Sequence, residues 1–286
     1  MFRRPMDFGG GWYPAGRESC QREIEAYWRE AGEEPGPHVH RARLGIAPHA
    51  GWMYSGRLAA RVFQWLADDP VIELVVVLGG HLRARDPIVA MSEGSWETPF
   101  GPFPIHGGFR AELERLDPVR FEREGRYTPD NSTELQLPFA KFKFPEAELL
   151  PLRVPPGPAA LMLGRALADY LEASHLDAAV IASTDLTHYG PHYDFTPKGR
   201  GYEALHWVRS ENDPAFIQAV EEGDPAAVLA TAERRHCACS AGAVAAAAEI
   251  ARRRGQRFHQ LEYATSADVA GDDAENFVGY LAGVYL

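Results

Sequence analysis

Residues 71–78 read Val-Ile-Glu-Leu-Val-Val-Val-Leu, a run that is apolar except for Glu73 and rich in β-branched side chains. A strand with this composition is typical of the centre of a sheet that is covered on both faces. Residues 176–183 (LDAAVIAS) have the same character and predict a second central strand. The short apolar run at residues 44–47 ends at Pro48 and predicts a third strand that passes into a loop. These strands place the chain in the α/β class.

Helical patterns lie between and after these strands. The segment 241–254 is the clearest helix, because it is rich in alanine, carries arginines near its end and is followed by Gly255. The alternation of strands and helices predicts a single layered domain over residues 1–286, with a mostly parallel or mixed sheet flanked by helices. The other predicted helices cover residues 19–30, 58–66, 158–170, 214–221 and 225–233, and two late strands cover residues 258–264 and 277–285.

The composition is that of an ordinary globular protein, with 45% hydrophobic and 24% charged residues among 286. The chain carries 29 basic and 40 acidic residues, which gives a net charge of −11. Because such a surface repels phosphate backbones, we expect no nucleic-acid partner. No apolar run approaches the roughly 20 residues that a membrane-spanning helix needs, so we expect no membrane partner either.

The cellular compartment is suggested by the first residues and by the cysteines. Two arginines near the start are not followed by an apolar segment, so we expect no secretory signal. Three cysteines, Cys20, Cys237 and Cys239, are too few for a disulfide framework and indicate a reducing environment. A cytoplasmic location is therefore expected, while the sequence specifies no oligomeric state.

Polar groups that bind metals recur at the ends of the predicted strands, where α/β proteins collect their functional residues. Each of them alone is more simply explained as a loop residue, a turn cap or a buried thiol. Their recurrence nevertheless indicates a common site, and a cysteine just before a helix favours the thiolate that binds metals. The groups are His49 in PHAG, His81 in GGH, Asp185 and His188 in STDLTHYG, and Cys237 and Cys239 before the alanine-rich helix.

Two common enzyme classes are not supported by the motifs. The glycines at 79 and 80 follow a strand, but the chain has no GxGxxG or GxxxxGK[ST] pattern for nucleotide phosphates. It also lacks the GxSxG turn of serine hydrolases with an α/β fold.

One segment carries a family resemblance. Residues 46–56 (IAPHAGWMYSG) resemble the signature of the Memo family, also called AmmeMemoRadiSam system protein B. Further segments follow in the family's order, so the likeness spans nearly the whole chain. They are GGWY at 10–13, VLGGH at 77–81, TPF at 98–100, STELQLPF at 132–139, STDLTHYG at 183–190 and GYLAG at 279–283.

The resemblance implies a fold like that of the class III, LigB-type extradiol dioxygenases, which are non-haem iron enzymes. It also implies a metal site of two histidines and one cysteine, which fall on His49, His81 and Cys237. The match around Cys237 is partial, so Cys239 is an alternative ligand.

Several positions depart from the family pattern. Asn131 and Gln136 stand where the family often has histidine, and Phe8 stands where a histidine precedes the N-terminal motif. The turn that ends at His81 is one residue shorter than in the family and continues with Leu82. The resemblance therefore implies the metal ligands but no particular substrate.

The leading hypothesis is a non-haem Fe(II) oxygenase of the extradiol type that takes O2 and a phenolic or otherwise chelating small molecule. His188 is predicted to move protons, because the pKa of an unperturbed histidine is about 6.5. The family arrangement places Asp185 where it would orient a ligand or the substrate. Tyr54 and Glu134 are predicted to bind a substrate hydroxyl, although Glu134 could equally form a salt bridge or a helix cap.

Two alternatives remain at this point. The site could hold copper or iron without turnover, in a metal-handling or interaction protein, since a thiolate is softer than the carboxylate of most Fe(II) oxygenases. It could also hold zinc with an open position that activates water, as in a hydrolase.

Overall fold

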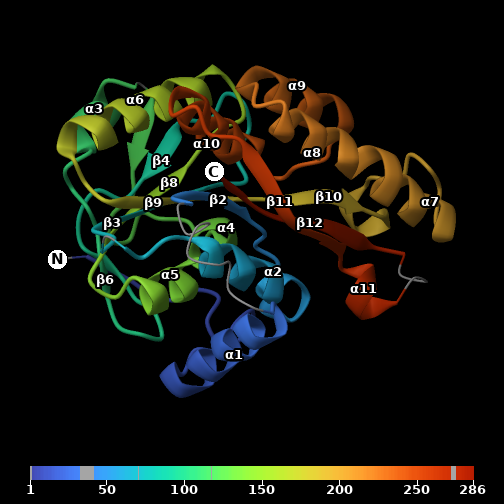
Figure 1. Ribbon diagram of the computed structural model, residues 1–286, viewed down its shortest axis with the longest axis horizontal. Helices are drawn as coiled ribbons and strands as arrows, with labels where there is room; N and C mark the ends of the chain where they lie inside the picture. The colour runs from blue at the N-terminus through green and yellow to red at the C-terminus, as the bar shows by residue number, and fades with distance from the viewer. Residues whose placement is uncertain (1, 33–41, 70, 117, 272–274) are drawn as a thin grey trace.

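The computed structural model describes residues 2–32, 42–69, 71–116, 118–271 and 275–286 of the chain. It confirms the predicted α/β class, because helices cover both faces of a large mixed sheet (Figure 1). The single domain predicted over residues 1–286 includes residues outside these ranges and stays a prediction. In spatial order the strands of the sheet are β10 (Asp185–Tyr189), β12 (Phe277–Tyr285), β2 (Leu44–Ala47), β9 (Ala178–Ser183), β3 (Leu74–Gly79), β8 (Glu148–Arg153), β4 (Ile88–Ala90) and β7 (Val119–Phe121), with β11 (Phe258–Thr265) paired to β12.

The centre of the sheet is parallel and its edges are mixed. Strands β2, β9, β3 and β8 run parallel, whereas β12 runs antiparallel to β2, β10 and β11. Alternate residues of β3 enter different cores, as the period of two in a strand requires. Val76 packs into the core beneath one helical layer and Val77 into the core beneath the other. The uninterrupted apolar run therefore reflects burial on both faces.

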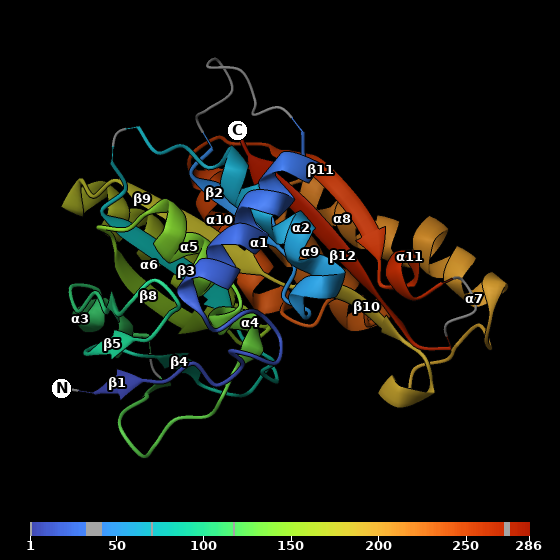
Figure 2. The same cartoon turned by 90° about the horizontal axis from the view of Figure 1, so that it is seen from below.

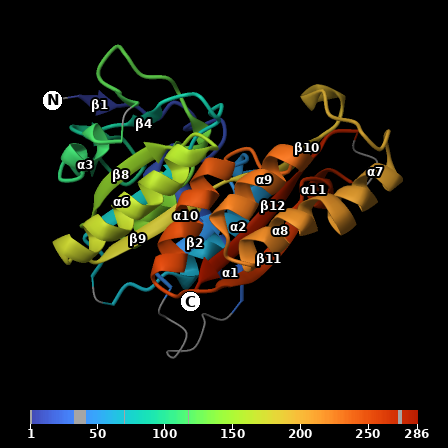
Figure 3. The ribbon, with the colours of Figure 1, turned by 90° about the horizontal axis from the view of Figure 1, so that it is seen from above.

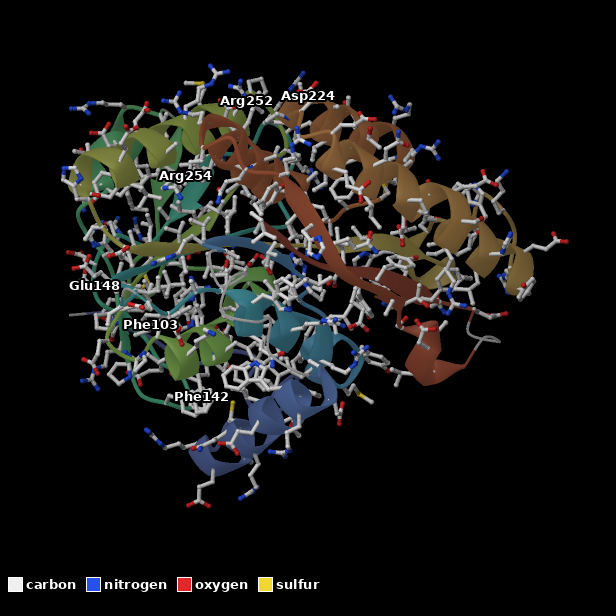
Figure 4. All side chains as sticks on the ribbon, in the orientation of Figure 1. Phe103, Phe142, Glu148, Asp224, Arg252 and Arg254 are labelled. Atoms are coloured by element: carbon white, nitrogen blue, oxygen red, sulfur yellow. The ribbon has the colours of Figure 1, made fainter. Side chains whose placement is uncertain are left out.

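The helices form two layers. Figure 2 shows α1 (Arg17–Glu30), α2 (Trp52–Trp65) and α5 (Leu137–Lys143) on one face of the sheet. Figure 3 shows α6 (Pro158–Ser174), α10 (Ala241–Arg253), α8 (Asp213–Glu221) and α9 (Pro225–Arg235) on the other. Figure 4 labels Phe142 of α5 in this layer. Its ring lies 5.4 Å from that of Trp28 on α1.

Shorter elements complete the fold. A small second sheet has the order β1 (Arg3–Arg4), β5 (Ser95–Trp96) and β6 (Phe103–Pro104). The short helices are α3 (Arg110–Glu114), α4 (Asn131–Glu134), η1 (Pro191–Tyr193), α7 (Tyr202–Trp207), the π-helical turn η2 (Val208–Asn212) and α11 (Ala267–Ala270). Among the described residues, no helix is long and apolar enough to cross a membrane.

Several elements differ from the sequence prediction, which did not include short ones such as β4, β7 and α5. Helix α2 begins at Trp52 rather than at residue 58, because its first turn mixes buried residues with the exposed Met53 and Tyr54. Strand β8 was not predicted, since it contains Pro151, whose missing N–H removes a normal ladder bond. Residues 185–189, which follow the predicted strand 176–183, form a strand of their own, β10, with a bulge between Asp185 and His188.

The pairing of β9 and β10 with their neighbouring strands determines where the loop after β2 lies. Strand β9 runs beside β2, with Ser183 opposite Ala47, and the N–H of Thr184 donates to the Ala47 carbonyl at 3.0 Å. The chain then pairs with β12 at Tyr280 as β10, whereas β2 pairs with β12 from Gly283 onward. Strands β2 and β10 thus occupy successive parts of one edge of β12, and the loop after β2 turns at their junction.

Candidate metal centre

Three possible metal ligands come from three separate loops and converge near the end of β2. His49 comes from the loop after β2, His81 from the turn after β3, and Cys239 from the loop before α10. The Nε2 atoms of the two histidines lie 3.1 Å apart, and Cys239 Sγ lies 3.2 Å from His49 Nε2. All three ligand atoms lie within 4.8 Å of one another. The group offers two imidazole nitrogens and one sulfur around a common point.

This arrangement fits a metal ion. With metal–ligand bonds of about 2.1–2.3 Å, a tetrahedral ion separates its ligand atoms by roughly 3.4–3.8 Å, close to the spacings in this group. Imidazole and thiolate together suit zinc, copper and iron. Three protein ligands leave a position open for water or a substrate, as catalytic metal sites do.

Hydrogen bonds hold both the backbone and the ring of His49. It is buried, and its backbone N–H donates to Asp185 Oδ1 at 2.7 Å. Its Nδ1 lies 3.0 Å from Ser183 Oγ, so the tautomer with Nε2 as ligand donates its Nδ1–H to that hydroxyl. Gln136 Nε2 donates to Ser183 Oγ at 3.0 Å and to the carbonyl of Pro48 at 2.8 Å. These hydrogen bonds hold the His49 ring with Nε2 toward His81 and Cys239.

His81 is placed by a glycine turn. Gly80 has a φ of +107°, and a Cβ there would lie 2.7 Å from the Cβ of Arg153, so only glycine fits. The N–H of Gly80 donates to Ser132 Oγ at 2.6 Å, which fixes the turn. The Oδ2 atom of Asp130 lies 3.8 Å from His81 Nδ1 and orients the ring from behind.

The thiolate of Cys239 and the nearby carboxylates favour a cation between Cys239 and the two histidines. Burial disfavours the thiolate of Cys239, but the charge of His49 and hydrogen bonds from both histidines outweigh it and hold the pKa well below the usual range. Burial lowers the pKa of His81, but the neighbouring Asp130 carboxylate and Cys239 thiolate outweigh that effect and raise it to about 10. The sulfur therefore tends to be the anion that binds metals.

The third ligand predicted at Cys237 is corrected to Cys239. His236 ends α9 in the left-handed conformation, with φ of 52°, and Cys237 directly after it stays against that helix. Its Sγ donates to the Thr231 carbonyl at 3.7 Å, and burial, aided by the charge of Asp213, raises its pKa to about 12. Cys239 instead forms two hydrogen bonds with the backbone of Asp185. The Asp185 N–H donates to the Cys239 sulfur at 3.2 Å, and the Cys239 N–H donates to the Asp185 carbonyl at 3.1 Å.

An open pocket of about 640 Å³ adjoins the group, and His81 faces it. Asp185, His188 and Tyr54 line the pocket as well, so three of the predicted site residues lie beside the candidate ligands. The His188 ring lies edge-on to Tyr193 at 4.9 Å, with Nδ1 at 3.1 Å from the Leu186 carbonyl. Aromatic rings form much of the remaining wall. They belong to Trp12, Tyr13, Trp52, Tyr193 and Tyr280.

Glu134 is not among the residues that line this pocket, and the substrate-binding role predicted for it stays a prediction. It is buried, and its two oxygens accept hydrogen bonds from the N–H groups of Asp7 (3.0 Å) and Phe8 (2.8 Å) and from the Tyr13 hydroxyl (2.9 Å). Residues 10–14, next to these donors, form one wall of the pocket. Glu134 therefore holds that wall in place.

Sequence reasoning missed Ser183 and Asp130, which orient the two histidines. Asp130 precedes a short helix and accepts from the N–H of Thr133 at 3.2 Å, so its sequence context signals only a helix cap. Ser183 is the last residue of a buried strand. Nothing local in the sequence indicates that either residue faces a histidine.

Comparison with known proteins places the chain in a family. The model for Memo-like proteins matches residues 4–284. The chain belongs to the Memo family. It is 30% identical to a MEMO1 family protein of Pyrococcus abyssi over 98% of each chain, and 31% identical to one of Methanopyrus kandleri over 100% of this chain and 99% of the other. An uncharacterized protein of Escherichia coli K12 superimposes with a TM-score of 0.47 and 13% identity, over 84% of this chain and 99% of that one.

The departures from the Memo pattern have structural roles in this chain. Asn131 Nδ2 donates to the carbonyl of His49 at 3.2 Å, and Gln136 holds Ser183 and the loop before His49. Phe8 packs its ring edge-on to Trp12 at 5.3 Å. These residues support the ligands and the wall of the pocket.

Glu134→Gln is expected to loosen that wall and to lower the free energy of unfolding by about 1–3 kcal/mol, because an amide NH2 would face donors that need an acceptor. Urea denaturation followed by tryptophan fluorescence measures the change. The exposed Glu30→Gln on α1 is the matched control and should stay within about 0.5 kcal/mol of the parent. An equal, small effect of both variants would contradict the positioning role.

Proposed function

We propose that this Memo family protein is a non-haem Fe(II) oxygenase of the extradiol type, acting on a phenolic or chelating small molecule. The observation that carries the proposal is the group of His49, His81 and Cys239, which opens through His81 into a pocket lined by Asp185 and His188. Two imidazoles and one anionic ligand with open positions resemble the ligand layout of Fe(II) oxygenases, in which the anion is usually a carboxylate.

A ferrous ion held by these three ligands would supply the redox chemistry that joins O2 to an organic substrate. With a catechol, the reaction breaks a ring carbon–carbon bond beside a hydroxyl-bearing carbon. Both oxygen atoms enter the product, so O2 is reduced and the ring carbons are oxidised. The reaction needs no external reductant.

The residues of the pocket suit this substrate class. His188 would accept the proton of a substrate hydroxyl, because its ring lines the pocket and its Nδ1 is engaged by a carbonyl, which leaves Nε2 for the substrate. Tyr54, partly exposed on the first turn of α2, would hydrogen-bond a second hydroxyl. Asp185 would keep His49 and Cys239 in place, since its atoms bond to the backbone of both. The aromatic rings of the wall would bind a planar ring.

The test measures O2 uptake by protein that was purified without air and loaded with one Fe(II) per chain. Uptake that depends on an added catechol is expected. His188→Gln should keep the iron and lower kcat by about 10²–10⁴-fold, the usual range for a lost general base. His206→Gln, an exposed histidine on α7, is the control and should leave kcat unchanged. Iron-loaded protein that takes up no O2 with any catechol would overturn the proposal.

A second candidate, a protein that holds copper or iron without turnover, is favoured by Asn131 and Gln136. Both amides are engaged with the loop around His49 at positions where the Memo pattern often has histidine. Tight copper binding without substrate-dependent O2 uptake would support this candidate. Tightly bound zinc with no effect of O2 would instead support a hydrolase.

A further inference from the structure

A second pocket, also of about 640 Å³, lies on another part of the molecule and is rich in arginine. It is formed by β7, the start of α3 and the turn after β7, and it shares no lining residue with the pocket beside the metal centre. Its size is within the range of small-molecule sites. The arginines that line it are Arg110, Arg120, Arg123 and Arg126.

The backbone holds these arginines together. Arg123 and Arg126 form the two ends of a tight turn, in which Arg126 N–H donates to the Arg123 carbonyl at 2.8 Å and Gly125 adopts a φ of +68°. Arg120 lies in the middle of the edge strand β7. Arg110 is the first residue of α3, and its guanidinium stacks 4.8 Å from the centre of the Phe121 ring.

Within the part of the chain that the structure describes, the positive charge of this pocket is largely uncompensated. Arg110 pairs with Glu114 at 2.9 Å, but within the described ranges no carboxylate lies at ion-pair distance from the other three arginines. Glu122 lines the pocket, yet its carboxylate is already bound by the buried Arg4 and Arg153 beneath it. Among the described residues of the lining, Glu93 is the only other acid. Such a concentration of positive charge is notable in a chain with a net charge of −11.

The geometry points to a ligand class: we propose that this pocket binds a small anion carrying one or more phosphate groups. Guanidinium groups bind phosphate oxygens in pairs through their planar fork. The hydroxyls of Ser92, which accepts a hydrogen bond from Arg110 at 3.2 Å, and of Thr128 line the same pocket and add hydrogen-bond donors. Arg110 covers one face of the Phe121 ring and Arg4 one face of the Tyr127 ring, so the remaining surface of these rings is what an organic part of the ligand would contact.

Calorimetric titration of the full-length protein with pyrophosphate at low ionic strength tests this site. The double variant Arg123→Gln/Arg126→Gln is expected to weaken binding by about 10-fold or more, the effect of losing charge-assisted hydrogen bonds. The control Arg22→Gln/Arg29→Gln removes the same charge from exposed positions of α1 and should change the affinity by less than about 2-fold. His81→Ala should bind pyrophosphate as the parent does, because the two pockets are separate.

The outcomes are distinct. No heat at millimolar pyrophosphate, equal weakening by both double variants, or loss of binding in His81→Ala would overturn the site. ADP in place of pyrophosphate identifies the source of the phosphate. Tighter binding of ADP would support an organic phosphate that stacks on the aromatic rings, and equal binding would support the free anion.

Discussion

Cys239→Ser is expected to release the metal, whereas Cys237→Ser is expected to retain it. The sulfur of Cys239 lies 3.2 Å from His49 Nε2 and receives hydrogen bonds that stabilise the thiolate. A serine hydroxyl stays protonated near neutral pH and cannot supply the anionic ligand. Since removing even an outer partner of a metal ligand typically costs 10–100-fold in affinity, losing this ligand should weaken binding by about 100-fold or more.

The measurement is elemental analysis after equilibration with a competing chelator, with circular dichroism to confirm the fold. Cys237→Ser is the matched control, because it makes the same chemical change two residues away in a thiol that faces the Thr231 carbonyl. Metal lost from Cys237→Ser and kept by Cys239→Ser would reverse the assignment. Equal retention by both variants would remove cysteine from the ligand set.

The choice between Cys237 and Cys239 shows which part of the metal site could be predicted from the sequence and which part could not. His49 and His81 could be predicted at one edge of the sheet because each follows a strand buried on both faces, and the carboxyl ends of parallel strands lie at the same edge. Strand β9 separates the two strands, β2 and β3. The cysteine segment follows a helix instead. Which of its two thiols faces the site depends on the left-handed residue His236 and on the bonds of Cys239 to Asp185, and neither is visible in the pattern.

Contacts between distant segments explain the other differences. Glu134 accepts from residues more than 120 positions earlier in the chain, so its carboxylate could not be assigned to the N-terminal segment from its neighbours. Strand β10 forms because β12 offers a free edge beyond the end of β2. The local sequence of β10, rich in polar residues, favours a loop.

A buried charge network lies behind His81 and is the second feature with a large expected effect. Glu122 accepts from the guanidinium groups of Arg4 and Arg153 and from the N–H of Thr128, the last at 3.0 Å. Arg153 also lies 3.8 Å from Asp130, the residue that orients His81. All four charged side chains of this network are at most 8% exposed, so each charge depends on its partners.

Glu122→Gln is therefore expected to lower the free energy of unfolding by about 3–5 kcal/mol, the usual cost of leaving buried charges without their partner. Two arginines would lose one carboxylate, and a neutral amide would present an NH2 group to donors. Urea denaturation measures the change. The control is Glu124→Gln, an exposed acid two residues away, which should stay within about 0.5 kcal/mol of the parent.

The same variant separates stability from site geometry. Because Arg153 keeps Asp130 as its second partner, the Asp130–His81 contact should survive in the folded fraction, and metal affinity at low temperature should change by less than about 10-fold. A stable Glu122→Gln variant would show that the arginines find other partners or water. Complete loss of metal from a variant that is still folded would instead show that Glu122, through Arg153, sets the position of His81.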